Sequence, residues 1–410
     1  MAFRDDLTVP QNQSAGALEA DDGAGKRSLN RRQFVQSGAL SALSLVPGFE
    51  RLYALPGEDL PAGKFVSLVD FEDEGVAPVG TPIGTELDGR LYTDLSRLSQ
   101  RRLVTPSAEF YIRTAASRLL PDSSQWKVSL KGLVEHPSAL DIQALRGAAK
   151  PMGLHLMECA GNVRLTRFGL ISVANWSGVP ISAILDDAKI KADASWVQVS
   201  GFDNYASPSA TSIPGASWIF PLEELKAAGA FLATAMNGQM LTGDHGAPVR
   251  LVVPGWYGCA CIKWVTSIAV VDDGAEATSQ MKEYAARTLQ EGIPQLAKDF
   301  QPATIDHAAM PVRVEKWIVS GKPRYRVVGI LWGGSQAVAT LQIRFNPDKE
   351  FVPVKGFRQV KADPWTIWTH TWSPQAPGRY SIRLAVTDPP VRARKLDSGY
   401  YVRSVNISEV

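Results

Sequence analysis

Residues 156–164 of this chain read Leu-Met-Glu-Cys-Ala-Gly-Asn-Val-Arg. The preceding residues 153–157 have the pattern of a strand, and Gly161 and Asn162 tolerate the tight backbone of a loop. Cys159 is therefore expected on a loop directly after a strand. A thiolate there suits a soft or high-valent metal better than it suits magnesium or calcium. The alternative is an inert buried cysteine, because free cysteine also packs as a small hydrophobe.

The chain has 410 residues, of which 45% are hydrophobic and 20% charged. This length suffices for two domains, and the composition is that of an ordinary soluble globular protein. A net charge of +2 gives no reason to expect a nucleic-acid or membrane-surface partner. The three cysteines form neither an even disulfide framework nor a Cys-x-x-Cys zinc pattern. The sequence has no Cys-x-x-Cys-His motif, so we expect no c-type haem in this chain.

The N-terminal residues have the pattern of an export signal. Residues 30–34 read Asn-Arg-Arg-Gln-Phe, and a mildly apolar run follows at 37–46. Paired arginines before such a run are typical of a twin-arginine signal, whereas a membrane span needs about 20 apolar residues. We therefore predict a signal and linker over residues 1–60, export in the folded state and a periplasmic location. The alternative is a disordered basic tail before a short helix.

Two patterns of secondary structure divide the remainder. Residues 60–100 are punctuated by proline and glycine, which predicts irregular structure, and a helix is expected to start at Pro221. Strands are predicted over 126–133, 195–200, 249–253 and 264–271. Because regular βαβα alternation is missing, residues 61–300 are predicted to form an α+β domain. Alternating residues in 339–345 and 380–386 indicate a β-sandwich over 301–410.

The stretch 156–164 closely resembles the cysteine loop of the sulfite oxidase family. In that family the equivalent cysteine is the only protein ligand to a molybdenum–pterin cofactor. The resemblance extends over most of residues 105–410. It implies that Cys159 binds the molybdenum of a molybdopterin cofactor. It also implies an α+β molybdopterin domain over 61–300 and an immunoglobulin-like dimerisation domain over 301–410, and thus a homodimer.

Further positions match the family's substrate pocket. Arg113 and Arg164 correspond to arginines that face an anionic substrate. Tyr284 follows Trp264 by twenty residues, the spacing of the family's active-site tyrosine. The resemblance thus implies a small oxyanion such as sulfite as substrate. Taken alone, Arg113 could be a surface arginine, and Tyr284 could be a half-buried residue of an ordinary helix.

The cofactor pocket is matched by a second set of residues. His245 and Arg250 lie in a stretch, 244–250, that resembles the family's pterin-binding segment, and Lys263 fits a phosphate or pterin contact. Asp203 matches a further cofactor-contacting acid of the family. Alternatively, His245 is a satisfied structural histidine and Asp203 an ordinary turn residue.

Several positions depart from the family pattern. Thr114 and Ala115 stand where the family commonly has Asn-His, and Ala260 replaces an arginine. Residues 165–169 lack the usual tryptophan, and residues 392–396 lack the motif that would send a third arginine into the pocket. We therefore expect an intact cofactor site beside an altered substrate pocket.

Cys259 and Cys261 flank Ala260 in the same stretch. Residues two apart in an extended segment point to opposite faces, so joint ligation of one metal is not expected. A disulfide between them would be strained. Both are therefore interpreted as small packing residues, with a minority hypothesis that Cys261 faces the pterin.

The leading prediction is a periplasmic molybdopterin-dependent enzyme that oxidises sulfite to sulfate by oxo transfer. Since the chain carries no haem motif, electrons would pass to a separate cytochrome c. One alternative keeps the cofactor but acts on another S- or N-oxide or an organic sulfur compound. A second alternative is a cofactor-free binding or adhesion protein.

Overall fold

The computed structural model describes residues 63–115, 120–202, 216–348, 350–359, 364–388 and 391–410. These residues belong to one compact unit. The twin-arginine signal predicted over 1–60 and the predicted site residue Asp203 lie outside the described residues. None of the described helices has the length and apolar character needed to cross a membrane.

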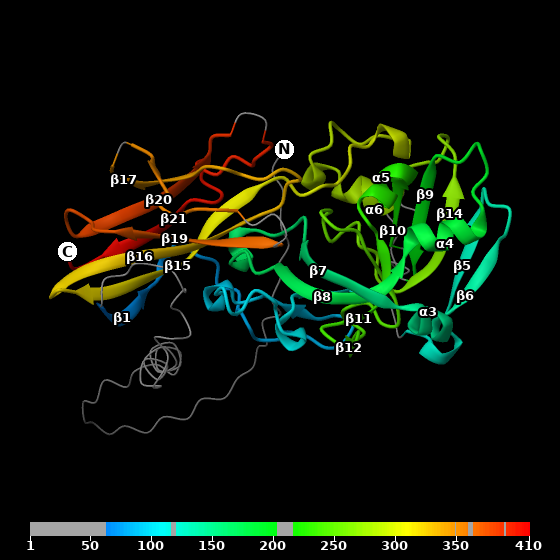
Figure 1. The fold of residues 1–410 in the computed structure, drawn as a ribbon, viewed down its shortest axis with the longest axis horizontal. Helices are drawn as coiled ribbons and strands as arrows, with labels where there is room; N and C mark the ends of the chain where they lie inside the picture. Colours follow the sequence, from blue (N-terminus) through cyan, green and yellow to red (C-terminus); the bar gives the residue numbers. More distant parts are fainter. Residues whose placement is uncertain (1–62, 116–119, 203–215, 349, 360–363, 389–390) are drawn as a thin grey trace, which may run out of the picture. The chain divides into compact units, whose positions relative to one another are not determined.

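Two sheets organise the residues before 300 (Figure 1). The first sheet, in the spatial order β10-β9-β14-β5-β6, consists of Ser217–Pro221, Trp196–Gly201, Val265–Val271, Lys127–Gly132 and Ser138–Asp141. The second sheet, in the order β12-β11-β8-β7 with β13 paired to β11, consists of Gln239–Met240, Phe231–Met236, Ile171–Pro180, Lys150–Glu158 and Arg250–Val252. A short ribbon pairs β3 (Arg90–Leu91) with β4 (Ile112–Arg113).

Four short α-helices accompany these sheets: α3 (Ile142–Ala148), α4 (Ile181–Ala188), α5 (Leu222–Ala227) and α6 (Ser279–Tyr284). Helices α5 and α6 contact β10, whereas α3 and α4 contact β8 (Figure 1). Single 3-10 turns are η1 Leu95–Arg97, η2 Ser107–Glu109, η3 Ser123–Gln125, η4 Arg164–Thr166, η5 Ala286–Thr288 and η6 Ala297–Asp299. Of the strand pairs in these two sheets, only β5 and β14 run parallel. This arrangement agrees with the predicted α+β class, and the strands predicted before residue 300 are confirmed.

Two antiparallel sheets contain the strands after residue 300. One has the order β1-β15-β16-β19, with strands Gly63–Val69, Ala308–Val319, Lys322–Trp332 and Trp365–Trp372. The other has the order β18-β17-β20-β21-β2, with strands Val352–Pro353, Leu341–Asn346, Gly378–Val386, Arg403–Ile407 and Phe71–Glu72. Contacts of β15 with β20 and of β1 with β21 join the two sheets. An immunoglobulin-like topology and a role in dimerisation stay predictions.

The expectation of irregular structure over residues 60–100 is wrong for residues 63–72. Strand β1 pairs with β15 and β2 pairs with β21, so both belong to sheets formed mainly after residue 300. Phe65 is 9% exposed and packs edge-on against Trp317, with ring centroids 5.6 Å apart. Pairing with a distant strand thus overrides the local punctuation. The division at residue 300 stays a prediction.

Candidate cofactor and active site

The cysteine loop begins where β7 ends at Glu158. Cys159 donates its backbone N–H to the Leu170 carbonyl at 2.9 Å, and its own carbonyl accepts from the Asn162 N–H at 2.9 Å. The side-chain oxygen of Asn162 accepts from the Leu170 N–H at 3.0 Å, which closes the loop. The predicted strand and loop are therefore confirmed. Burial raises the pKa of the Cys159 thiol, while the nearby Arg113, the Gly161 N–H and Arg287 lower it in part.

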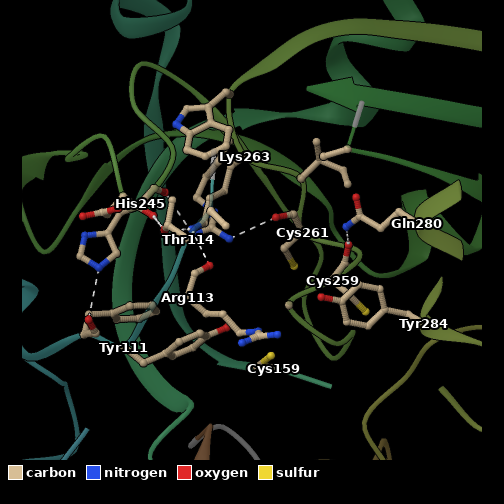
Figure 2. A pocket seen from close by; sticks show the side chains of 18 residues that line it. Tyr111, Arg113, Thr114, Cys159, His245, Cys259, Cys261, Lys263, Gln280 and Tyr284 are labelled. Atoms are coloured by element: carbon tan, nitrogen blue, oxygen red, sulfur yellow. Dashed lines mark hydrogen bonds between the residues drawn. The ribbon is translucent and has the colours of Figure 1, made fainter. Parts of the chain in front are cut away.

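One pocket contains six of the eight predicted site residues (Figure 2). They come from segments far apart in the chain: Arg113, Cys159, His245, Arg250, Lys263 and Tyr284. Thr114, Tyr111, Cys259, Cys261 and Gln280 also line the pocket. The wall nearest the cations is built around Gly246, whose φ is +101°. A Cβ there would lie 3.0 Å from the Arg250 Cβ and 3.2 Å from the Lys263 Cβ, so these two side chains leave room only for glycine.

Two basic side chains, Arg250 and Lys263, line this part of the pocket. Arg250 is 3% exposed and donates to the His245 carbonyl at 3.0 Å and the Cys261 carbonyl at 3.1 Å. Its Nε has no hydrogen-bond partner among the described residues. Lys263 donates to the Thr114 hydroxyl at 2.6 Å, and burial together with the Arg250 charge lowers its pKa to about 7. Buried cations that lack a paired carboxylate fit an anionic group, and a thiol beside them fits a soft metal. The residues present therefore fit a molybdenum–pterin cofactor with a phosphate.

His245 is held by the protein through both ring nitrogens. Its Nδ1 lies 2.9 Å from the Thr242 hydroxyl and its Nε2 lies 3.2 Å from the Phe110 carbonyl. Burial lowers the pKa of His245 to about 4, so the ring is neutral at pH 7. A neutral imidazole donates through one nitrogen and accepts through the other, which places the proton on Nε2. The geometry thus favours the structural interpretation of this histidine, as part of the pocket wall.

Arg113 and Tyr284 lie together near Cys159. Figure 2 shows the Arg113 guanidinium directed toward the Cys159 sulfur, and a hydrogen bond joins Arg113 to Tyr284. Burial opposes the charge of Arg113, but Cys159 and Tyr284 outweigh that effect and raise its pKa. Burial, then the proximity of Cys159, raises the pKa of Tyr284, so its phenol stays protonated at neutral pH. Tyr284 ends helix α6, so the helix interpretation and the pocket interpretation of this residue both hold.

Arg164 does not enter the pocket, contrary to the position that the sequence predicts. Its Nη2 donates to the Gly399 carbonyl at 2.7 Å, the Tyr400 carbonyl at 3.2 Å and the Val402 carbonyl. These backbone acceptors lie more than 230 residues away in the sequence, so local patterns contain no signal for them. The role of Arg164 in binding an anion stays a prediction that this geometry does not support.

The expectation that Cys259 and Cys261 face opposite sides is also wrong. Residues 257–261 form a turn, in which the Ala260 N–H donates to the Tyr257 carbonyl at 2.9 Å and the Cys261 N–H to the Gly258 carbonyl at 3.2 Å. Both cysteines are buried and both line the pocket. The sulfur of Cys261 accepts from the Val253 N–H at 3.4 Å. The turn, which the assumption of an extended segment missed, brings the two side chains to one cavity.

Arg394 is a residue that the sequence pattern did not single out. Its guanidinium forms a bidentate ion pair with Glu158, with distances of 3.0 Å and 2.7 Å. The indole N–H of Trp332 donates to the same carboxylate at 2.8 Å, and Glu158 is 1% exposed. A buried carboxylate needs such partners. The presence of Glu158 directly before Cys159 was therefore a signal in the sequence that a basic partner residue exists elsewhere in the chain. The pair ties the start of the cysteine loop to the C-terminal segment.

Comparisons with known proteins agree with this site. Residues 116–279 match the family model of the oxidoreductase molybdopterin binding domain. A sulfite oxidase of Gallus gallus is 24% identical over 345 residues, which cover 77% of this chain and 71% of that protein. A sulfite oxidase of Macaca fascicularis is 25% identical over 333 residues, which cover 75% and 58%. A nitrate reductase (NADPH) of Beauveria bassiana is 27% identical over 259 residues, 56% of this chain and 28% of that protein. The match thus spans less than a third of the length of these nitrate reductases, including one of Brassica napus and one of Fusarium oxysporum.

The crystal structure of the sulfane dehydrogenase SoxCD from Paracoccus pantotrophus has the same fold. Its TM-score is 0.58 at 18% identity, and the match covers 90% of this chain and 99% of that one. This likeness supports the predicted sulfite-oxidase-type fold. The family model and the sulfite oxidase relatives agree with the pocket described above. In it, the Cys159 thiol lies near Arg250 and Lys263, two buried basic side chains without a paired carboxylate. On these grounds residues 116–279 are assigned to the oxidoreductase molybdopterin binding domain, and the findings together support a molybdenum oxidoreductase of the sulfite oxidase family.

Proposed function

We propose that this protein oxidises sulfite, or a closely similar sulfur oxyanion, with a molybdenum–molybdopterin cofactor. The observation that carries the proposal is the pocket that Arg250 and Lys263 line and in which Cys159 lies beside Arg113. The sulfite oxidases among the relatives support sulfite as the substrate. Electrons would pass to a separate cytochrome c, and the active form would be a periplasmic homodimer assembled through residues 301–410.

The cofactor, when bound, supplies the two-electron chemistry that turns sulfite and water into sulfate and two protons. Cys159 would hold the metal through its sulfur, and Arg250 and Lys263 would neutralise the cofactor's phosphate. Arg113 would bind substrate oxygens through its guanidinium fork, which lysine cannot reproduce. Tyr284, protonated because of its raised pKa, would donate a hydrogen bond to an oxygen of the same anion.

Replacement of the thiol tests where the metal is held. We expect Cys159→Ser to lose the molybdenum that purified wild-type protein contains, as measured by elemental analysis. The matched control is Cys259→Ser, another buried cysteine of the same pocket, which should keep its metal. A fully loaded Cys159→Ser protein, or equal loss in both variants, would contradict the assignment.

Electron paramagnetic resonance of anaerobic wild-type protein tests the substrate. A molybdenum(V) signal elicited by sulfite would support the whole proposal. A signal with dithionite but not with sulfite would keep the cofactor and reject sulfite. No signal with either reductant, together with absent metal, would reject the enzymatic proposal.

A second candidate is the reduction of an oxidised nitrogen or sulfur compound at the same site. Nitrate reductases are among the relatives, including one of Neurospora crassa that is 33% identical over 173 residues, 37% of this chain and 17% of that protein. Arg164 also points away from the pocket, so the predicted pair of anion-binding arginines is not formed. Oxidation of a reduced dye by nitrate or a sulfoxide, without turnover of sulfite, would favour this candidate.

A further inference from the structure

We propose that Arg287 is the second anion-binding residue of the active site and that, with Arg113, it selects doubly charged oxyanions. The inference rests on the proposed function, because it assigns a residue and a charge class to that same substrate. Arg287 would take the anion-binding role that the sequence predicts for Arg164.

The position of Arg287 places its charge beside the cysteine loop. The point that a Cβ on Gly161 would occupy lies 3.5 Å from the Arg287 Nη1 and 3.8 Å from the Cys159 sulfur. The guanidinium carbon also lies 5.4 Å from the centre of the Tyr284 ring. Arg287 thus lies beside the cysteine loop and the Tyr284 ring, at the edge of the site, because it is not one of the residues that line the pocket itself.

The backbone that carries Arg287 is held in place. Arg287 lies in η5, directly after helix α6, and the Thr288 hydroxyl donates to the Tyr284 carbonyl at 3.0 Å. Gln290 closes the turn, since its N–H donates to the Ala285 carbonyl at 3.0 Å. The Gln290 side-chain Nε2 donates to the Gln301 carbonyl at 2.9 Å, and its Oε1 accepts from the Gln301 N–H at 2.7 Å. A fixed turn costs less entropy when the side chain binds an anion.

The charge of Arg287 is not neutralised by its described surroundings. Arg164 is bound to three carbonyls and Arg394 is paired with Glu158, so neither guanidinium is available to an anion. Among the described residues, Arg287 has no carboxylate or hydrogen-bonding partner, and its side chain is exposed. An exposed cation without a carboxylate partner, beside the loop that carries Cys159, attracts anions from solvent.

Two guanidiniums from different segments suit an anion with two charges and several oxygens. Each fork can bind two oxygens, and hydrogen bonds between ionised groups are about twice as strong as neutral ones. Sulfite and sulfate fit this description, whereas nitrate has a single charge. The pair therefore favours sulfur oxyanions over nitrate.

Binding of inert anions to the purified holoenzyme tests the inference without any turnover. Thermal unfolding is followed against sulfate and against nitrate at constant ionic strength. We expect a saturable rise of Tm with sulfate in the wild type, because a ligand stabilises the folded state that it binds. Arg287→Gln should weaken the apparent sulfate affinity about tenfold or more, which corresponds to the loss of one charged hydrogen-bonding partner. Arg287→Lys should restore part of it.

The control is Arg101→Gln, which removes another exposed arginine, one that has no described contact with Gly161 or with the Tyr284 ring. General stabilisation by sulfate acts on all variants alike and cancels in the comparison. An Arg287→Gln protein with wild-type sulfate affinity would overturn the inference, as would a nitrate effect equal to that of sulfate.

The inference and the proposed function can fail separately. Sulfate binding that depends on Arg287, in a protein that does not oxidise sulfite, rejects the function and keeps the anion site. Sulfite oxidation with an unchanged KM in Arg287→Gln keeps the function and rejects the role of Arg287.

Discussion

At the scale of single residues, the pocket has charges whose partners come from distant segments. Cys159, Arg113 and Tyr284 interact with one another, whereas Arg164 lies only five residues after Cys159 and is directed elsewhere. Sequence proximity to the thiol is therefore a poor guide to which arginine meets the substrate. The fold decides which arginine contacts the substrate, because a guanidinium binds the carbonyl or carboxylate oxygens that the folded chain places within hydrogen-bonding distance.

His245 leads to a pH-dependent prediction. Its pKa is lowered from 6.5 to about 4 because it is buried, so the unfolded chain binds more protons between these values. The stabilisation is complete above pH 6.5 and is lost as the pH falls toward 4, by at most about 1.4 kcal/mol per pH unit. We expect His245→Gln to flatten the decline of unfolding free energy in urea titrations over this window.

His370 provides the companion variant, because burial lowers its pKa to about 4 as well. His370→Gln should flatten the decline of the unfolding free energy over the same pH window by a similar amount. The double variant should flatten this decline further. An unchanged slope in His245→Gln would show that the ring is charged in the folded protein.

At the scale of elements, β1 shows how tertiary pairing makes a strand where local sequence predicts none. Its register runs from Gly63 opposite Val319 to Val69 opposite Val314, with a bulge between Phe65 and Ser67. The strand thus completes a sheet whose other members lie about 250 residues later. Burial of Phe65 against Trp317 stabilises this pairing.

Phe65→Ala tests that contribution. We expect it to lower the free energy of unfolding by about 3–5 kcal/mol, because a large buried side chain is removed and a cavity remains. Urea denaturation measures the change. Val66→Ala is the control, since the neighbouring Val66 is 39% exposed and should cost less than about 1 kcal/mol. Equal effects of the two substitutions would mean that β1 does not dock through Phe65.

At the scale of the whole chain, the cysteine loop is clamped by the C-terminal segment. Glu158 pairs with Arg394, Arg164 bonds to carbonyls of residues 399–402, and the Tyr400 hydroxyl donates to the Asn162 carbonyl. The geometry around the proposed metal ligand therefore depends on residues more than 200 positions away.

Arg394→Met tests this dependence. Removal of one partner leaves Glu158 buried and unpaired, so we expect a loss of about 3–5 kcal/mol in unfolding free energy. Because Glu158 precedes Cys159, we also expect altered molybdenum(V) resonance parameters. The control is Arg326→Met, which breaks the buried pair of Arg326 with Glu315, 2.6 Å apart, while Glu315 keeps its pair with Arg313. Equal resonance spectra in both variants would contradict an effect of the Glu158–Arg394 pair on the metal site.

Adjacent residues predicted the loop that carries Cys159 and the α+β strand pattern, and short stretches that resemble the family predicted six of the pocket residues. These features are local, because turn residues, alternation and a short motif are written in adjacent positions. Tertiary contacts alone place Arg164 against the C-terminal carbonyls, Arg394 against Glu158, Cys259 and Cys261 at one cavity and Arg287 beside the cysteine loop. Such contacts join segments brought together by folding, and the position of a side chain's partner in space is not encoded in its neighbours along the chain.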